Sequence, residues 1–246
     1  MSVNLILDAI DDVAEATSVA AIDDRLGRAI RSCGLTYYAV LRHPRPHDDP
    51  RSRLLTVHFP AGWPDRYVQK GYVVIDPVIR YLGHVRHGFR WREAIEAFAE
   101  TPNARRMERM IMDATRYGLH DGYLFPVHSR HGLVGSMTIG GEAVDLSRRT
   151  MVLLEMLAKR AFWRLIEIKA PEFLRDQPAP TELKLTHREM EALGCLSEGL
   201  TSPEIANVLE ISNHTVDWYM NGIQQKLQAR NRHHTVAIAF RLGLIS

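Results

Sequence analysis

The sequence predicts an α+β protein in two parts: an N-terminal α-β-α sandwich with an antiparallel sheet, and a C-terminal all-α domain of four helices with a helix-turn-helix. Three observations favour this. Residues 1–169 mix helix-like and strand-like segments without the regular alternation of a doubly wound fold. Residues 170–183 hold Pro171, Pro178 and Pro180 and predict a linker, because proline removes helix donors and stiffens a connector. Residues 184–246 show only short helical patterns.

The N-terminal domain is expected to run from helix to strands and back to helix. Apolar residues at helical spacing predict helices over 3–31, 64–82 and 101–117, and a long closing helix over 146–168. Residues 37–43 and 53–59 predict strands that a turn-rich stretch separates. Residues 123–129 and 133–141 predict a hairpin that turns around residues 130–132.

The helix starts of the tail have clear local signatures. Thr186 is followed three residues on by Glu189, and Thr201 by Glu204, and each pair predicts a capping box. Ser212 is expected to cap a third helix, and residues 233–242 complete the domain with a fourth. An apolar face is expected on the second of these helices, formed by Ile205, Val208 and Leu209.

The third tail helix has one apolar stripe and one polar face. The residues expected to be buried are Val216, Met220, Ile223 and Leu227. The residues expected to face outward are His214, Asp217, Trp218, Asn221 and Gln225. A short helix, a tight turn and a second helix with a polar outer face fit a recognition helix in the major groove of DNA. An ordinary small helical bundle has the same periodicity, so this pattern alone leaves both readings open.

Composition and charge limit the possible classes of protein. The 246 residues contain 46% hydrophobic residues, have a formal net charge of +2, and include two cysteines, Cys33 and Cys195, that suggest no disulfide framework. A reducing cytosol is therefore expected, with no signal peptide and no membrane span. The twelve histidines lack a convergent set of metal ligands, so neither a metal nor a cofactor is expected. Residues 184–246 hold six Lys or Arg and six Asp or Glu, which is weak support for binding phosphates.

An aromatic constellation stands out in the N-terminal domain: Trp63, Tyr67, Asp76 followed by Pro77, and Trp91. Tryptophan supplies one donor and an ionised aspartate only accepts, so together they can hold a ligand that has a carbonyl and an amide N–H. The residues alone favour a plainer interpretation, in which the aromatic side chains fill the core and Asp76 caps a turn before Pro77.

The tail resembles the DNA-binding domain of the LuxR family. The resemblance lies in Leu185-Thr186-x-Arg188-Glu189-x-Glu191, Gly199-x-Thr201-x-x-Glu204-Ile205-Ala206, Ile211-Ser212, Thr215-Val216, Lys226-Leu227 and Asn231-Arg232. It implies that Lys226 and Arg232 contact phosphates and that Thr215 belongs to the DNA-contacting helix. Leu200 and Asp217 depart from the pattern, because the family often has basic residues there.

The N-terminal domain resembles the autoinducer-binding domain of LuxR-type quorum-sensing regulators, through Trp63, Tyr67, Asp76-Pro77, Trp91 and Gly122. The resemblance implies binding of an N-acyl-homoserine lactone, with Trp63 donating to the lactone carbonyl and Asp76 accepting from the amide N–H. It also implies that Tyr67 and Trp91 pack around the head group and that Thr138 reaches the acyl carbonyl. Phe59 stands where several members have tyrosine, and the missing hydroxyl points to a different acyl class.

These observations predict a ligand-responsive transcription regulator rather than an enzyme. The alternatives are a ligand-independent regulator of the same fold, an enzymatic domain attached to a helix-turn-helix, and a phosphorylation-gated receiver, for which no acidic cluster is evident. A homodimer on a two-fold symmetric DNA site is expected. The closing helix supports it with Met151, Leu154, Leu157, Ala158, Ala161 and Leu165, more apolar surface than one domain face needs, and the last helix adds Val236 and Phe240.

Overall fold

The computed structural model describes residues 2–43, 53–129, 132–175 and 185–245. The chain divides into two compact units with a boundary near residue 175, and each unit is described by itself. The predicted turns over 44–50 and 130–131, and residues 176–183 of the predicted linker, lie outside the described residues. Within the described ranges, no helix combines the length and the apolar character needed to cross a membrane.

The N-terminal unit is built on a five-stranded sheet in the order β2-β1-β5-β4-β3. Its strands are β1 (Tyr37–Arg42), β2 (Leu54–His58), β3 (Phe89–Arg90), β4 (Asp121–Ser129) and β5 (Gly132–Gly141). β1 pairs antiparallel with both β2 and β5, and β3 pairs antiparallel with β4. The predicted antiparallel sheet is confirmed, with the long β4 and β5 at its middle.

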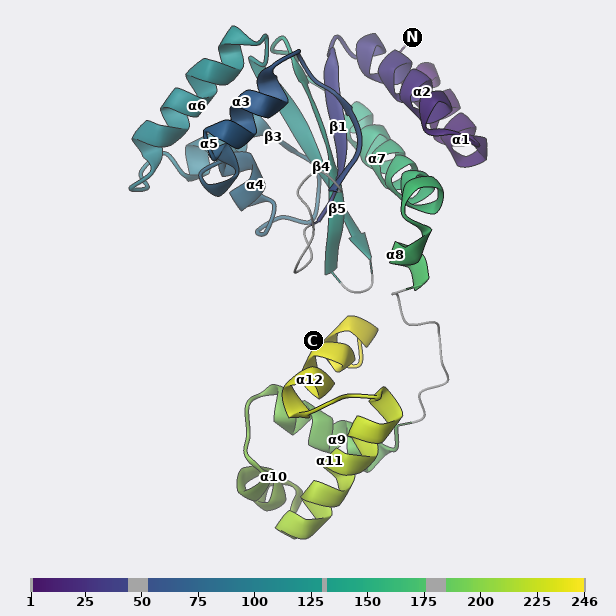
Figure 1. The fold of residues 1–246 in the computed structure, drawn as a ribbon, viewed down its shortest axis with the longest axis vertical. Coiled ribbons are helices and arrows are strands. Elements are labelled where there is room, and N and C mark those ends of the chain that lie inside the picture. Colours follow the sequence, from purple (N-terminus) through teal and green to yellow (C-terminus); the bar gives the residue numbers. More distant parts are fainter. Residues whose placement is uncertain (1, 44–52, 130–131, 176–184, 246) are drawn as a thin grey trace. The chain divides into compact units, whose positions relative to one another are not determined.

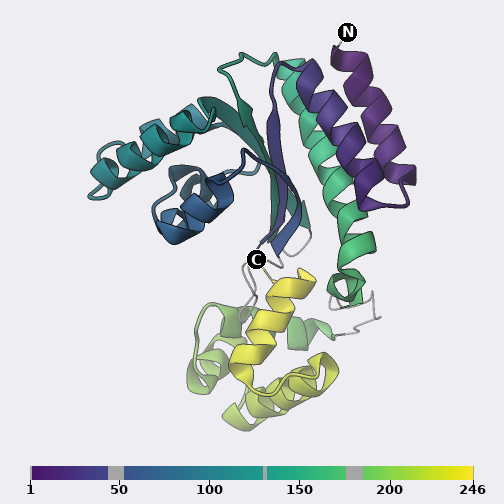
Figure 2. The same cartoon turned by 45° about the horizontal axis from the view of Figure 1, so that its top comes forward.

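Helices cover both faces of this sheet (Figures 1 and 2). One face carries α1 (Ser2–Glu15), α2 (Val19–Ser32) and α7 (Arg148–Lys169). The other carries α3 (Trp63–Gln69), the 3₁₀ turn η2 (Tyr72–Val74), α4 (Pro77–Tyr81), α5 (Trp91–Ala97) and α6 (Ala104–Arg116). The predicted α-β-α sandwich is therefore confirmed, and the two faces bury separate apolar clusters.

Two predictions for this domain were wrong in detail, and two elements were not predicted. The single helix over 3–31 is two helices, because the chain turns at residues 16–18 and Ser18 caps α2 by accepting from the Ala21 N–H. The single helix over 64–82 is broken into α3, η2 and α4, because Gly71 adopts a left-handed conformation at φ 61° and Asp76 starts a new helix. The edge strand β3 and the helix α5 were not predicted.

The face of α7 that points to the sheet closes the larger core. Leu154, Leu157, Ala158, Ala161 and Leu165 are all fully buried within their own domain. The prediction that these residues provide spare apolar surface for a partner is wrong, because the sheet and α1 already cover them. The apolar side chains of α7 that remain exposed are Val152 and Met156, at 54% and 52%.

The first residues of the predicted linker, Pro171–Arg175, form the short helix α8, with Phe173 buried in the N-terminal core. The tail then folds into α9 (His187–Ser197), α10 (Ser202–Leu209), α11 (Asn213–Leu227) and α12 (Arg232–Leu242), which confirms the four-helix domain. Both predicted capping boxes are present, and Ser212 caps α11. Val208 does not belong to the buried face of α10, because its side chain is 60% exposed.

Candidate functional site

Trp63 is the centre of an aromatic cluster between the sheet and the helices α3 and α6. It lies at the first position of α3 and is only 7% exposed. Its ring centroid is 5.8 Å from that of Tyr67, 6.1 Å from that of Tyr72 and 5.6 Å from that of Tyr117. Sequence reasoning missed Tyr72 and Tyr117, because neither belongs to the motif and Tyr117 comes from the far end of α6.

Asp76 combines both roles that the sequence left open. As the N-cap of α4, its Oδ1 accepts from the Val78 N–H at 2.8 Å, and its Oδ2 accepts from the Tyr67 hydroxyl at 2.7 Å. Burial raises the pKa of Asp76, and the hydrogen bonds from Tyr67 and Val78 offset part of this effect.

Trp91 reaches the same cluster from the start of α5. Its Nε1 donates to Thr138 Oγ1 on β5 at 3.2 Å, and Thr138 Oγ1 lies 3.4 Å from the Tyr123 carbonyl oxygen, to which it donates. Gly140 leaves room for the indole, because a Cβ there would lie 2.3 Å from Trp91 Cη2. No local pattern explains the glycine at this point of β5, because its packing partner Trp91 is distant along the chain.

The six predicted ligand-site residues therefore gather at one place. Phe59, Tyr67 and Trp91 pack against the aromatic cluster around Trp63. Asp76 is hydrogen-bonded to Tyr67, and Thr138 is hydrogen-bonded to Trp91. The indole N–H groups of the two tryptophans differ. Trp91 uses its donor on Thr138, whereas no described residue accepts from Trp63 Nε1. The cluster thus combines apolar side chains, one available donor and one partly buried carboxylate.

In the tail, α11 presents the polar face that was predicted. His214, Asp217, Trp218, Asn221 and Gln225 are exposed, with Trp218 at 67%, and Thr215 is half-buried beside the Ser212 cap. The predicted stripe of Val216, Met220, Ile223 and Leu227 is buried. The orientation of this helix is therefore fixed by its core, which leaves the polar face exposed.

Both cations that the family resemblance assigns to phosphates already have partners inside the tail. Lys226 Nζ lies 2.6 Å from Glu189 Oε2, and the Glu189 side chain is only 7% exposed. Arg232 donates to Asp217 Oδ1 at 2.7 Å and to Ser202 Oγ at 2.8 Å. The first pair joins α9 to α11, and the second joins α12 to α11 and α10.

Comparison with known protein families identifies two domains in the chain. Residues 18–165 match the autoinducer binding domain, and residues 183–239 match the domain of bacterial regulatory proteins of the luxR family. The chain belongs to the LuxR family of regulators. A quorum sensing-dependent transcriptional regulator of the helix-turn-helix type, RpaR of Rhodopseudomonas palustris, is 30% identical over 234 residues, which cover 95% of this chain and 92% of RpaR.

Solved structures support the fold of this LuxR-family chain. The crystal structure of Escherichia coli SdiA superposes with a TM-score of 0.56 at 21% identity, covering 98% of each chain. CepR2 of Burkholderia cenocepacia, an N-acylhomoserine lactone-dependent LuxR-family transcription factor, superposes with a TM-score of 0.53 at 23% identity, covering 69% of this chain and 98% of CepR2. At these identities the likeness concerns the fold alone.

Proposed function

We propose that this LuxR-family regulator binds an N-acyl-homoserine lactone in the aromatic cluster and reads a two-fold symmetric DNA site as a homodimer. The observation that carries the proposal is the pairing of an available donor, Trp63 Nε1, with the partly buried acceptor Asp76 in one apolar cluster. A lactone with an amide-linked acyl chain presents the complementary groups, a carbonyl and an N–H. The dependence of CepR2 on this class of ligand agrees with it.

The chemistry of the cluster suits holding a ligand better than converting it. Asp76 already accepts from Tyr67 and Val78, and around it stand tyrosine and tryptophan rings rather than a nucleophile beside a base. The relatives are transcription regulators, and we propose that this chain likewise has no enzymatic activity. We infer that it acts in the cytoplasm, because the DNA that it would bind lies there.

The proposed homodimer rests on apolar side chains that remain exposed. Val152 and Met156 lie one turn apart on α7, at 54% and 52% exposure, and Phe240 on α12 is 55% exposed. Clusters of exposed apolar residues on regular elements are typical of protein interfaces. A closed two-fold dimer would present two copies of α11 to DNA and would explain a symmetric site.

A thermal unfolding series with a panel of acyl-homoserine lactones tests the ligand. A ligand that binds only the folded state raises the unfolding midpoint as its concentration increases. At a ligand concentration of 100 times the dissociation constant, the folded state is stabilised by about 2.7 kcal/mol. A matched panel of hydrolysed, ring-opened ligands is the control. A midpoint that no lactone moves would favour a ligand-independent regulator, and release of ring-opened product from intact lactone would favour an enzyme.

A further inference from the structure

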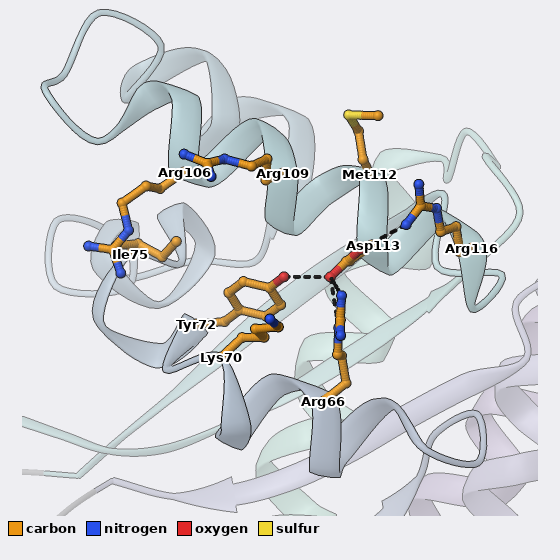
Figure 3. A pocket seen from close by; sticks show the side chains of 9 residues that line it. All are labelled: Arg66, Lys70, Tyr72, Ile75, Arg106, Arg109, Met112, Asp113 and Arg116. Atoms are coloured by element: carbon orange, nitrogen blue, oxygen red, sulfur yellow. Dashed lines mark hydrogen bonds and ion pairs between the residues drawn. The ribbon is translucent and has the colours of Figure 1, made fainter.

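A pocket of different composition adjoins the aromatic cluster and shares Tyr72 and Ile75 with it. It has a volume of about 460 Å³ and is formed by α3, the turn that follows it, and α6 (Figure 3). Its lining is mostly basic. It includes one carboxylate, Asp113, and the cations Arg66, Lys70, Arg106, Arg109 and Arg116, with Tyr72, Ile75 and Met112 completing the wall. Pockets of this volume hold small molecules.

The one carboxylate in the pocket neutralises only part of this charge. Asp113 Oδ2 accepts from Arg66 Nε at 2.9 Å and from the Tyr72 hydroxyl at 2.6 Å, and Asp113 Oδ1 accepts from Arg116 at 3.3 Å (Figure 3). The hydrogen bonds from Tyr72 and Arg66 hold the pKa of Asp113 below its usual value, so this carboxylate is ionised at neutral pH.

The remaining cations have no carboxylate of their own. Among the described residues, no acidic side chain lies within 4.0 Å of Lys70, Arg106 or Arg109. Arg109 is oriented by a hydrogen bond from its Nε to the Arg105 carbonyl, and Arg106 extends across the pocket toward Ile75 (Figure 3). Several like charges around one hollow repel each other unless an anion enters.

Contacts with Asp113 hold one of the pocket's cations, Arg66, in a defined orientation. Asp113 is 8% exposed and orients the Arg66 guanidinium through two contacts, Nε at 2.9 Å and Nη2 at 2.7 Å. Arg106 comes from α6 and Lys70 from the end of α3, so two separate elements supply the lining cations. Guanidinium groups match the geometry of phosphate oxygens, which they bind with paired N–H donors.

We propose that this pocket binds a small phosphorylated molecule, with a pyrophosphate group held between Arg106, Lys70 and the guanidinium groups beside Asp113. A formal excess of four positive charges over the lining favours an anion of multiple charge. The concave shape and small volume favour a small molecule over a nucleic-acid backbone, which needs an extended basic surface. The pocket is distinct from the proposed lactone site, although Tyr72 and Ile75 belong to both walls.

The test is isothermal titration of the full-length chain with inorganic pyrophosphate and, in a separate arm, with adenosine diphosphate, at fixed ionic strength and without lactone. Lys70→Gln combined with Arg106→Gln removes two of the three lining cations that have no carboxylate partner. Arg105→Gln is the matched control, because Arg105 is an exposed neighbour on α6 outside the lining. All of these positions are exposed, so thermal unfolding of each variant should match that of the original chain.

We expect saturable binding at one site per chain in at least one arm, weakened about tenfold or more by the double variant through the loss of charge-assisted hydrogen bonds. Arg105→Gln should leave the affinity within about twofold. Tighter binding of the nucleotide would identify the Ile75 and Met112 wall as contact surface. No saturable binding in either arm, or an equal loss in Arg105→Gln, would overturn the proposal. Because lactone is absent, neither result depends on the proposed function.

Discussion

Arg232 at the start of α12 holds Asp217 on the exposed face of α11, with Arg232 Nη2 2.7 Å from Asp217 Oδ1. Ser202 completes the contact, because it accepts from Arg232 Nη1 and donates to Asp217 Oδ1 at 3.0 Å. Both side chains of the ion pair are more than one-third exposed, so the pair orients Arg232 and adds little stability. It accounts for an acidic residue on a surface that faces phosphates in the proposed complex.

Asp217→Asn is therefore expected to release Arg232 and to strengthen DNA binding. The neutral side chain no longer competes with phosphates for Arg232, so affinity should rise for specific and scrambled duplexes alike. The slope of log affinity against log salt should steepen by about 0.9 for each phosphate gained. Fluorescence anisotropy over a salt series measures both quantities.

Glu198→Gln, which removes an exposed negative charge at the end of α9, is the control for a general charge effect. Asp217 could instead contact a base directly, by accepting a hydrogen bond from cytosine N4. In that case Asp217→Asn should lower the base preference at one base pair without raising the affinity for scrambled DNA.

Lys226→Met is expected to destabilise the tail domain by on the order of 1–2 kcal/mol, because it leaves the buried Glu189 carboxylate with only its Thr186 hydrogen bonds. The loss stays below that of a fully buried pair, since the Lys226 side chain is 38% exposed. Hydrogen exchange of the α9 and α11 amides in the full-length chain measures it. Arg188→Met, which breaks a surface ion pair with Glu191, should change the opening free energy measured by exchange by less than about 0.5 kcal/mol.

The same contact predicts acid lability. Burial acts to raise the pKa of Glu189, but the hydrogen bonds from Lys226 and Thr186 outweigh it and hold the pKa below its usual value of 4.5. A depressed pKa adds stability that is complete above the unfolded value and is lost as pH falls through the folded one. Protection of α9 and α11 should therefore fall below about pH 4.5. Glu189→Gln should lack that part of the pH dependence, and an unchanged profile would contradict the assignment.

Local signals made the tail predictable. A capping box needs only residues three apart, and both boxes and the Ser212 cap are formed by the residues that the sequence indicated. The prediction of a single helix over residues 64–82 was wrong for the opposite reason. Its apolar spacing continues across Gly71, and the left-handed conformation of that glycine depends on packing that no local pattern shows.

The residues of the candidate ligand site were predictable as a set, but their geometry was not. The sequence motif identified Trp63, Tyr67, Asp76 and Trp91, whereas the hydrogen bond from Trp91 to Thr138 joins residues 47 positions apart. The basic pocket was missed because Arg106 and Arg109 look like a solvated helix face. Only the fold brings Arg66 and Lys70 to the same side of α6.

Asp76→Asn is expected to weaken lactone binding by about 1–3 kcal/mol, because the ligand amide loses a charged acceptor. The remaining amide oxygen can still accept from the Val78 N–H, so α4 should stay capped. Tyr67→Phe is the matched control. It removes the donor to Asp76, leaves the carboxylate in place, and should change the affinity only a few-fold. Titration calorimetry that shows equal effects of the two changes would remove Asp76 from the site.

Gly140→Ala is expected to disrupt the Trp91–Thr138 contact. The new Cβ would lie 2.3 Å from Trp91 Cη2, so the indole must move and its hydrogen bond to Thr138 is lost. Overpacking of this kind costs about 1–3 kcal/mol. Gly83→Ala has room, with its nearest atom at 3.8 Å, and should leave the domain's thermal unfolding nearly unchanged. A midpoint equal in both variants would show that the indole adapts without loss.

Asn221→Ala is expected to relax the sequence preference of DNA binding at one base pair. The buried stripe of Met220 and its neighbours fixes the rotation of α11, so Asn221 points outward one turn after Asp217. An asparagine in the major groove can pair bidentately with adenine, and its loss costs about 1–3 kcal/mol against the preferred base. Scrambled duplexes should bind nearly as before, because that binding comes from phosphate contacts.

Anisotropy with single-base-pair variants of a selected site measures the base preference. The control is Asn207→Ala, which changes an exposed asparagine on α10 and should preserve that preference. If Asn221→Ala keeps the original base preference, α11 does not read DNA through this residue.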